Sequence, residues 1–195
     1  MSGSIADFKA SFSTDLARPN RFDVFIPVPL GLLRFVKTTR QLRMRCESTE
    51  LPGRNIATAS TKIYNIEEKY PYQTTYGDIS LTFIVDDDMS EKKFFDAWLD
   101  WINPSGGSMN MKYKTDYAVP ITIFQYDLEN KISYAVQLLD AFPVSTNGMN
   151  LDWSSDGTHK LTVTFAYTRW RNNSLETQAL EFFNNSLATV RAALT

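Results

Sequence analysis

Two residue types with strong chemical potential occur only once each, as Cys46 and His159. A zinc site built from cysteine and histidine needs more ligands than these two, and one cysteine cannot form a disulfide within the chain. A serine or cysteine nucleophile that relies on a histidine would have to use His159 as its base. We expect Cys46 to be a buried thiol on an apolar strand face and His159 to be an exposed residue at the start of a strand. These residue types argue against an enzyme.

Three consecutive aspartates, Asp86, Asp87 and Asp88, raise the question of a Mg²⁺ or Ca²⁺ site. Neighbouring residues at a strand end point in different directions, so they are poorly placed to share one ion. Negative charge just before a helix is instead favourable at the positive end of that helix. The sequence has no Walker A loop, no GxGxxG motif and no GxSxG motif, and no pair of carboxylates stands out. We predict no catalytic residue, no metal site and no cofactor.

The one basic cluster lies between two strand signals, and its members are Arg34, Lys37, Arg40, Arg43 and Arg45. A strip of this kind can contact phosphate groups. However, 20 Lys and Arg against 22 Asp and Glu give a net charge of -2, so no overall field attracts nucleic acid. We interpret the cluster as a solvated strand face that pairs with Glu47 and Glu50, or as a subunit contact.

Length and composition indicate one folded domain. The chain has 195 residues, of which 13% are aromatic, and this aromatic content excludes a disordered chain. The first residues, MSGSIADFKASF, lack the apolar run of a signal peptide, and no stretch approaches about 18 uninterrupted apolar residues. We therefore expect a soluble, intracellular protein in a reducing compartment, with no membrane partner.

The pattern of apolar residues predicts a mainly β protein. Phe94, Phe95 and Trp98 share one stripe of an internal helix that Ser90 can cap and that ends before Asn103. A short helix is expected through Ile5, Phe8 and Phe12, and a C-terminal helix over 174–191. Strands are expected where apolar and polar residues alternate, at 22–26, 42–46, 79–85, 121–123, 132–138 and 158–168.

Residues 51–78 do not fit an ordinary connection. The segment is 28 residues long and only partly strand-like, and it carries Tyr64, Tyr70, Tyr72 and Tyr76. Tyrosine buries apolar area while it keeps a polar tip, which suits contact with another surface. We expect this segment to be functional.

Four strings, in order, resemble the tail tube proteins of contractile-tailed bacteriophages. The first is ARPNRFDVFIP at 17–27, which resembles the first strand of that family, and the second is ELPGR at 50–54, where the family's long loop departs. The third runs from Asp86 through Phe94, Phe95 and Trp98 to Trp101, and resembles the strand-to-helix junction. The fourth combines AFPV at 141–144, LDWSSD at 151–156 and LTVTFAY at 161–167, which match the closing hairpin.

The resemblance covers about residues 17 to 170 and implies a fold and an assembly. The implied fold is a β-sandwich whose antiparallel sheets form a barrel in the oligomer, with one internal helix and the two terminal helices. Six copies would form a ring, and rings would stack into a hollow tube through which the genome leaves the capsid. Tube proteins of type VI secretion systems and of phage-tail-like bacteriocins share this fold. The implied division of the chain is a tube-like domain, 1–170, and a helical extension, 171–195.

The resemblance also implies partners and contact residues. The partners are further copies of the chain, the tail sheath protein, the baseplate and tail-terminator proteins, and, in the lumen, the tape measure protein and double-stranded DNA held without sequence-specific binding. The particle would be a virion assembled in the host cytoplasm. Carried over, segment 51–78 would reach a neighbouring subunit or ring. The C-terminus departs from the resemblance, because minimal tube proteins of this family end near the strand equivalent to 158–170; here helix 174–191 would pack toward the sheath or brace an adjacent subunit. The expected subunit-interface residues are Arg54, Tyr64, Tyr70, Tyr72, Tyr76, Phe182 and Phe183.

Three alternatives stay open at this point. Proteins that initiate the tube at the baseplate resemble tube subunits, and so do tube proteins of non-viral contractile injection systems. A β-sandwich module that binds a glycan or single-stranded nucleic acid with exposed Trp and Tyr would be monomeric and would show ligand affinity. An enzyme would need a base other than His159.

Overall fold

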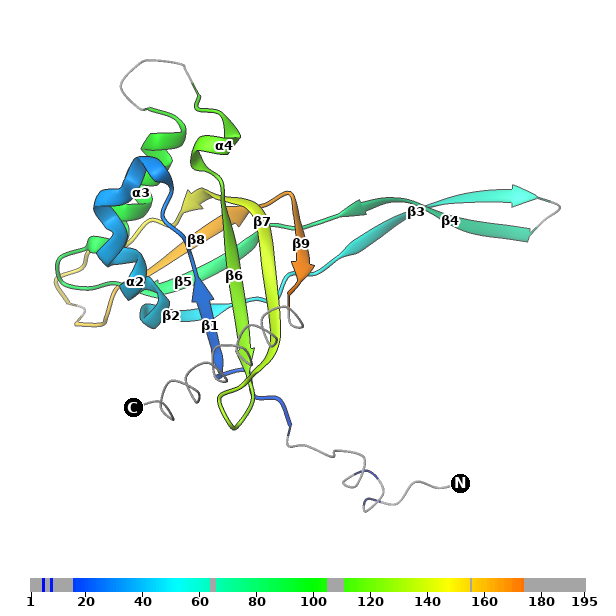
Figure 1. The fold of residues 1–195 in the computed structure, drawn as a ribbon, viewed down its shortest axis with the longest axis horizontal. Coiled ribbons are helices and arrows are strands. Elements are labelled where there is room, and N and C mark those ends of the chain that lie inside the picture. Colours follow the sequence, from blue (N-terminus) through cyan, green and yellow to red (C-terminus); the bar gives the residue numbers. More distant parts are fainter. Residues whose placement is uncertain are drawn as a thin grey trace, which may run out of the picture.

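The computed structural model describes residues 5, 8, 16–63, 66–104, 111–154 and 156–173 (Figure 1). The described residues form nine strands, three α-helices and one 3-10 helix, so the expected mainly β fold is confirmed. No helix in these ranges is long and apolar enough to cross a membrane. In chain order the elements are β1 (Phe22–Phe25), η1 (Leu30–Phe35), α2 (Val36–Arg45), β2 (Cys46–Thr49), β3 (Asn55–Ile63), β4 (Ile66–Thr75), β5 (Ile79–Ile84), α3 (Ser90–Ile102), α4 (Lys114–Tyr117), β6 (Val119–Tyr126), β7 (Ile132–Thr146), β8 (Lys160–Ala166) and β9 (Arg169–Asn172).

Two layers form the body, and one long strand belongs to both. The strand order is β1-β6-β7-β8-β5-β2, with β9 also paired to β7, and every pairing is antiparallel. The first part of β7 pairs with β6 and β9, and its last part pairs with β8. Between these parts Asp140 has a φ of 55°, and the Thr168 N–H donates to the Leu139 carbonyl at 3.0 Å. The ladder bends here, and Figure 1 shows β1 and β6 crossing the direction of β5 and β8.

The core lies between the two layers and under α3. Alternation in β5 and β8 places Leu81, Phe83, Val163 and Phe165 inside, all with no exposed area, as the sequence pattern predicts. Phe95 of α3 completes this core, with ring centroids 5.4 Å from Phe83 and 6.0 Å from Phe165. Aromatic contacts of this kind stabilise beyond the area they bury.

The start of α3 differs from the expected cap. Ser90 does not cap the helix, because its hydroxyl is buried without a hydrogen-bond partner. The Asp88 carboxylate instead accepts the Ser90 N–H at 3.1 Å, and Met89 adopts a left-handed φ of 55°. The aspartates therefore contribute at the helix start, as expected, while the predicted cap is wrong: the N-cap position is Met89, which makes no side-chain cap hydrogen bond.

The strand expected at 42–46 is wrong. Residues Val36–Arg45 form helix α2, which buries Thr38 and Leu42 four residues apart, and the strand begins only at Cys46. Met44, which supplied the apparent alternation, is 85% exposed. Helix periodicity thus overrides a short alternating pattern in this segment. In addition to α3, the single internal helix expected from sequence, the structure contains η1, α2 and α4.

The basic cluster is consequently divided. Arg43 pairs with Asp23 of β1, and Arg45 pairs with both Asp86 and Glu91. The expected pairing with Glu47 is wrong, because Glu47 pairs with Lys160. The Asp87 N–H and Arg45 hold the pKa of Asp86 below its usual range, so acidification through that pKa removes stability.

Two other expectations for single residues can be compared with the structure. Cys46 is half-buried, packs on the core, and has a thiol pKa that burial raises to about 12. His159 is half-buried rather than exposed, and its carbonyl accepts the Val85 N–H at 3.0 Å. Of the short helix expected through Ile5, Phe8 and Phe12, the structure describes Ile5 and Phe8, both in helical conformation, while the C-terminal helix expected over 174–191 lies outside the described residues.

Gly31 allows a close contact between η1 and α3. A Cβ at Gly31 would lie 2.3 Å from two ring carbons of Trp101. Gly31→Ala should therefore lower the free energy of unfolding by about 1–3 kcal/mol through overpacking. Urea denaturation tests this expectation, with Gly53→Ala as the control, since nothing lies within 4 Å of a Cβ at Gly53. Equal stability of the two variants would contradict it.

Candidate assembly surfaces

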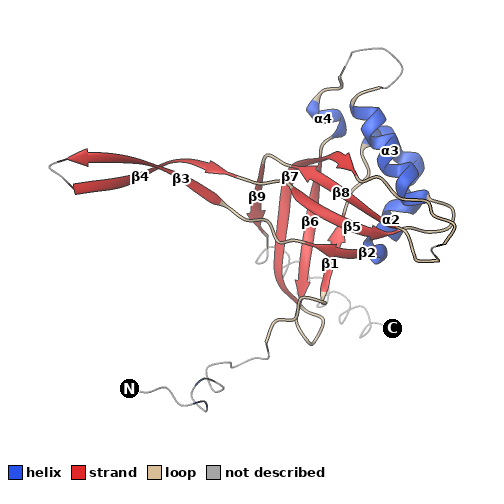
Figure 2. Cartoon of the chain, turned by 180° about the vertical axis from the view of Figure 1, so that it is seen from behind, coloured by secondary structure: helices blue, strands red, loops and turns tan. Residues whose placement is uncertain are grey.

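The tyrosine-rich segment forms a projecting arm. Strands β3 and β4 pair with each other from Asn55↔Thr75 to Ile63↔Ile66 and form a sheet of their own. Figures 1 and 2 show this arm extending away from the body along the long axis of the molecule. All ten residues of β4 are exposed. A two-stranded hairpin is marginally stable by itself in water, so the arm is suited to lie on a further surface.

The arm has two different faces. Tyr70 lies on one face of the arm, opposite Ala59 of β3, and Tyr72 lies at a bulge in β4, where the register shifts between Ala57 and Thr58. Tyr70 is 50% exposed and Tyr72 67% exposed. The other face carries Lys62 and Lys69, which alternate out of the tyrosine face. We call the first face the tyrosine face; it also includes Thr61, Ile66 and Glu68.

A carboxylate on the tyrosine face accepts a hydrogen bond from Tyr70. The Tyr70 hydroxyl donates a hydrogen bond to Glu68, and this bond raises the pKa of Tyr70. Tyr70 thus remains a neutral, amphipathic side chain, the type that is enriched in protein interfaces.

An aromatic cluster holds the arm at its root. The guanidinium of Arg54 lies 4.7 Å from the Trp170 ring centroid and 6.0 Å from that of Tyr76. The Trp170 indole N–H donates to the Gly53 carbonyl at 2.9 Å, and Tyr76 contacts Tyr167 at 6.2 Å between centroids. Burial raises the pKa of Tyr167. The cluster thus joins both strands of the arm to Tyr167, just after β8, and to Trp170 of β9.

Loss of the Trp170 ring should loosen this root. Trp170→Ala removes the stacked cation and the indole hydrogen bond, so amide exchange in 53–57 and 73–77 should accelerate about tenfold or more. Hydrogen–deuterium exchange measured by mass spectrometry tests this, with Trp153→Ala as a matched control on the opposite side of the molecule. Unchanged exchange at the root in Trp170→Ala would show that the cluster does not restrain the arm.

The structure separates the expected interface residues into three groups. Tyr70 lies on the tyrosine face and Tyr72 at the neighbouring bulge of β4, while Arg54 and Tyr76 lie at the root in contacts within the chain. Tyr64, Phe182 and Phe183 lie outside the described residues. Sequence reasoning missed Trp170, whose role depends on the pairing of β9 with β7.

A second surface is a face of hydroxyl groups on the β5 and β8 layer, opposite the core. The Ser80 and Thr164 hydroxyls are 3.4 Å apart, and those of Thr82 and Thr162 are 3.1 Å apart. The two neighbouring strands add a hydroxyl group to each pair: Ser48 of β2 lies opposite Thr82, and Ser145 of β7 lies opposite Thr164. We call these six uncharged residues the hydroxyl face; they are Ser48, Ser80, Thr82, Ser145, Thr162 and Thr164. The signal in the sequence is the alternation of Thr and Ser with apolar residues in β5 and β8.

The layer that carries the hydroxyl face has two free edges. Its four strands run in the order β7-β8-β5-β2, and β2 is the last strand at one end. At the other end, β6 pairs with β7 only as far as Ala141. The outer edge of residues 142–146 therefore has no partner strand among the described residues. Because four antiparallel strands alternate in direction, β2 of one copy would lie antiparallel to β7 of the next copy. Unpaired strand edges are templates for pairing with another chain.

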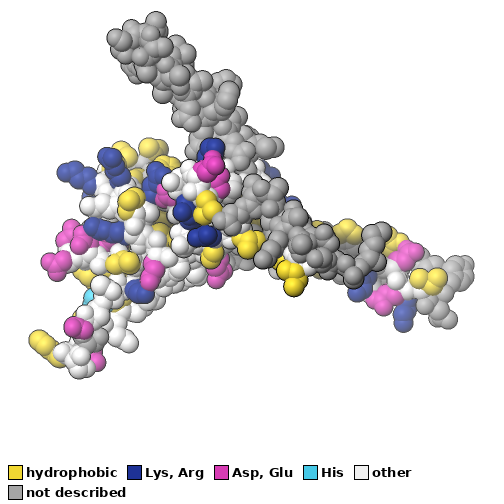
Figure 3. Space-filling model, turned by 90° about the horizontal axis from the view of Figure 1, so that it is seen from below, with side chains coloured by type: hydrophobic (Ala, Val, Ile, Leu, Met, Phe, Trp, Pro, Cys, Tyr) yellow, Lys and Arg dark blue, Asp and Glu magenta, His cyan; other side chains and the backbone are white. Residues whose placement is uncertain are grey.

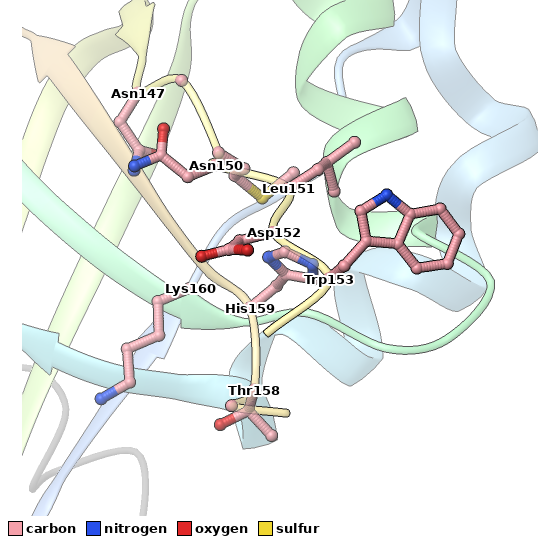
Figure 4. Close-up of a pocket in the computed structure, with 11 residues that line it drawn as sticks. Asn147, Asn150, Leu151, Asp152, Trp153, Thr158, His159 and Lys160 are labelled. Carbon is pink, nitrogen blue, oxygen red and sulfur yellow. The ribbon is translucent and has the colours of Figure 1, made fainter. Parts of the chain in front are cut away.

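A third surface lies at the opposite end of the molecule from the arm. The connection from β7 to β8 carries Leu151, 86% exposed, and Trp153, fully exposed. Asp152 shapes the turn, since its carboxylate accepts the N–H and the hydroxyl of Ser154, each at 3.0 Å. Figure 4 shows Leu151 and Trp153 directed away from Asn147 and Lys160, on the other side of a shallow pocket. We call residues 147–154 the β7–β8 loop.

Comparisons with known proteins agree with this architecture. The sequence model of the family described as "phage tail tube protein" matches residues 17–173. The search of curated proteins finds no match.

Solved structures share the fold. The chain is similar to a chain in the anti-feeding prophage (AFP) baseplate, 6-fold symmetrised, with TM-score 0.58 and 16% identity over 82% of this chain and 96% of that one. It is also similar to a chain in the sheath/tube terminator of an extracellular contractile injection system, PVC, in the extended state, with TM-score 0.57 and 18% identity over 82% and 98%. A chain of the PVC sheath-tube complex gives TM-score 0.56 and 17% identity over 88% and 98%.

At these identities the structural likeness concerns the fold alone, whereas the family model spans most of the sequence. Its match begins at residue 17, just before β1, and continues through β9, so it includes both layers, the arm and the β7–β8 loop. The chain belongs to the phage tail tube protein family.

Proposed function

We propose that this chain is a structural, non-enzymatic subunit of the inner tail tube of a contractile phage. Six copies form a ring, rings stack into a hollow tube, and the tube conducts the genome out of the capsid. The number of six comes from the resemblance to contractile tail tubes. The fold shared with chains of contractile injection systems supports the contractile class of particle.

The four-stranded layer β7-β8-β5-β2 is the main support for this assembly. Its two free edges are complementary in strand direction, so one contact between neighbours can be repeated around a ring. Closure of the sheet into a barrel removes the exposed edges. The contact is heterologous, because β2 of one copy meets β7 of the next.

The hydroxyl face then lines the lumen. The opposite face of the layer is occupied by the core and α3, which leaves the short Ser and Thr side chains to face the channel. Proteins that bind a DNA backbone neutralise it with Lys and Arg. Beside the hydroxyl face β8 carries one such residue, Lys160, and Lys160 is paired with Glu47. Such a wall would let double-stranded DNA and the tape measure protein pass without specific binding.

The remaining partner proteins would bind other surfaces of the subunit. In a tube of this orientation, η1 and α2 lie away from the lumen, so the exposed Arg34, Lys37 and Arg40 face the sheath. The baseplate and tail-terminator proteins bind the two ends of the stack. The subunit belongs to the virion and is assembled in the host cytoplasm.

Negative-stain electron microscopy of the purified protein, at several concentrations and salt levels, tests the proposal. Long hollow tubes of stacked rings are the expected result. Rings that never stack would favour a baseplate tube initiator, a role compatible with the fold shared with the AFP baseplate chain. A monomer under every condition would contradict a tube subunit of either kind.

A further inference from the structure

We propose that Lys114, Asp140 and Thr168 form a polar latch that holds the bend of β7 and thereby orders residues 142–146 for strand pairing with a second copy of the chain. The three side chains come from α4, from the bend itself and from the connection between β8 and β9. The inference rests on the proposed tube function and deepens it, because it assigns positioning residues to the contact between neighbours in a ring.

The polar latch consists of two hydrogen bonds that link a cation to a carboxylate. The ammonium of Lys114 donates to the Thr168 hydroxyl at 2.5 Å, and that hydroxyl donates to the Asp140 carboxylate at 3.2 Å. The Thr168 hydroxyl therefore acts as acceptor and donor at once. Hydrogen bonds with one ionised partner are shorter and stronger than those between neutral groups, so both bonds belong to the stronger class.

The backbone at Asp140 needs such support. Its φ of 55° lies in the left-handed region, which aspartate tolerates better than most residues other than glycine. Residues in this region keep their conformation where the surrounding structure fixes them. Besides its hydroxyl contact with Asp140, Thr168 donates its N–H to the Leu139 carbonyl at 3.0 Å. One residue of the β8–β9 connection thus binds both the backbone and the side chain at the bend.

The bend determines where the free edge begins. Before it, β7 pairs with β6 as far as Ala141, and after it β7 pairs with β8 from Phe142 onward. The register shifts between Pro143 and Ser145, and Val144 at this shift is 51% exposed. A bulge bends a strand and increases its twist, so the direction of this short edge depends on how its first residues are held.

Helix α4 connects the polar latch to the core. Tyr117 packs on Phe142, the first residue of the free edge, with ring centroids 5.2 Å apart, and the Lys114 ammonium lies 6.0 Å from the Phe142 ring centroid. The Tyr117 carbonyl accepts the indole N–H of Trp98, which has no exposed area, at 3.1 Å. Figure 1 shows α4 on the same side of the body as the end of β7. The start of the edge is therefore held from α4 and from the β8–β9 connection.

A second copy of the chain fits this edge. The last strand at the other end of the layer, β2, has the direction needed to pair antiparallel with β7 of the next copy. On the side away from α4, the described side chains of the body are a mixture of hydrophobic, basic and acidic types (Figure 3). Such a mixed face is not typical of an apolar docking surface, so we assign the contact to the strand edge. An edge that is ordered before it meets its partner loses less entropy on association.

Thr168→Val tests the inference, because valine keeps the shape of threonine but can neither accept from Lys114 nor donate to Asp140. The critical concentration for tube formation, measured by pelleting over a series of protein concentrations, should rise about three- to tenfold, as expected for the loss of one net hydrogen bond. Thr168→Ser keeps the hydroxyl and should restore assembly. The matched control is Thr39→Val, since the Thr39 hydroxyl donates to the Val36 carbonyl at 3.0 Å within α2 and not at the edge.

Amide exchange below the critical concentration tests the polar latch without assembly. In the unassembled protein, peptides that cover 139–146 should exchange about three- to tenfold faster in Thr168→Val than in the parent protein, because local opening of the bend becomes easier. Peptides that cover 161–165 of β8 should be unchanged, since this strand lies in the core. Thr168→Ser and Thr39→Val should match the parent protein in both regions.

Four outcomes would overturn the inference. They are unchanged exchange in 139–146 of Thr168→Val, faster exchange throughout β8, a critical concentration that stays constant although 139–146 exchanges faster, and a Thr168→Ser variant as impaired as Thr168→Val. The second outcome would assign Thr168 to overall stability, and the third would separate the bend from assembly. A parent protein that never assembles would overturn the tube function, while the exchange measurement would still show whether the polar latch holds the bend.

Discussion

Replacing Tyr70 and Tyr72 with serine is expected to abolish tube formation and leave the body of the protein folded. Both side chains are exposed on the arm, so their removal costs the core nothing. Buried aromatic anchors typically contribute about 2 kcal/mol or more each to an interface. Every subunit of a ring brings one arm, so the loss is repeated around the ring and affects stacking far more than the folding of one chain.

Lys62→Ser combined with Lys69→Ser is the matched control, because it removes two long side chains from the opposite face of the same arm. Tubes counted by electron microscopy, and pelleted protein after high-speed centrifugation, measure the outcome, and circular dichroism checks the fold. Deletion of 55–75 should have the same effect as the tyrosine variant. Normal tubes from either the tyrosine variant or the deletion would remove the arm from the stacking contact.

Glu91→Ala is expected to lower the free energy of unfolding by about 3–5 kcal/mol, the cost of breaking a buried ion pair. Glu91 has no exposed area, pairs with Arg45, and accepts the Asp86 N–H at 3.1 Å. Its removal leaves the guanidinium of Arg45 with Asp86 alone and the Asp86 N–H without its acceptor. Helix α2, the β5–α3 connection and helix α3 meet at this point.

The control for this prediction is Glu129→Ala. Glu129 pairs with Lys131 in a turn where both side chains are more than 70% exposed, and such surface pairs contribute about 0–1 kcal/mol. Chemical denaturation of the variants measures the difference. Similar midpoints for Glu91→Ala and Glu129→Ala would show that the buried pair contributes little.

Strands were predictable wherever one face is buried and the other is solvated. In β5 and β8 the alternation of apolar residues with Ser and Thr matches the inner and outer faces residue by residue. The strand predicted at 42–46 was wrong because Leu42, Met44 and Cys46 alternate in sequence, although of these three only Leu42 is buried. The continuation of β7 past Pro143 was also missed, since pairing with β8 stabilises that part from the other layer.

The candidate surfaces were predictable only in part. Tyr70 and Tyr72 could be expected from the unusual length and tyrosine content of 51–78, because both signals are local in sequence. Trp170 could not be assigned, since its contact with Gly53 depends on a chain separation of 117 residues. Trp153 had no local signal that separated it from a core residue, because exposure is a property of the folded chain.

A cryo-electron-microscopy reconstruction of the assembled protein tests the central claim most directly. We expect a hollow tube whose channel wall is formed by β7, β8, β5 and β2, with the hydroxyls of Thr82 and Thr162 facing the channel and α2 and α3 outside. β2 of each subunit would pair with residues 142–146 of its neighbour. A channel lined by other strands, or an assembly without a channel, would contradict the account.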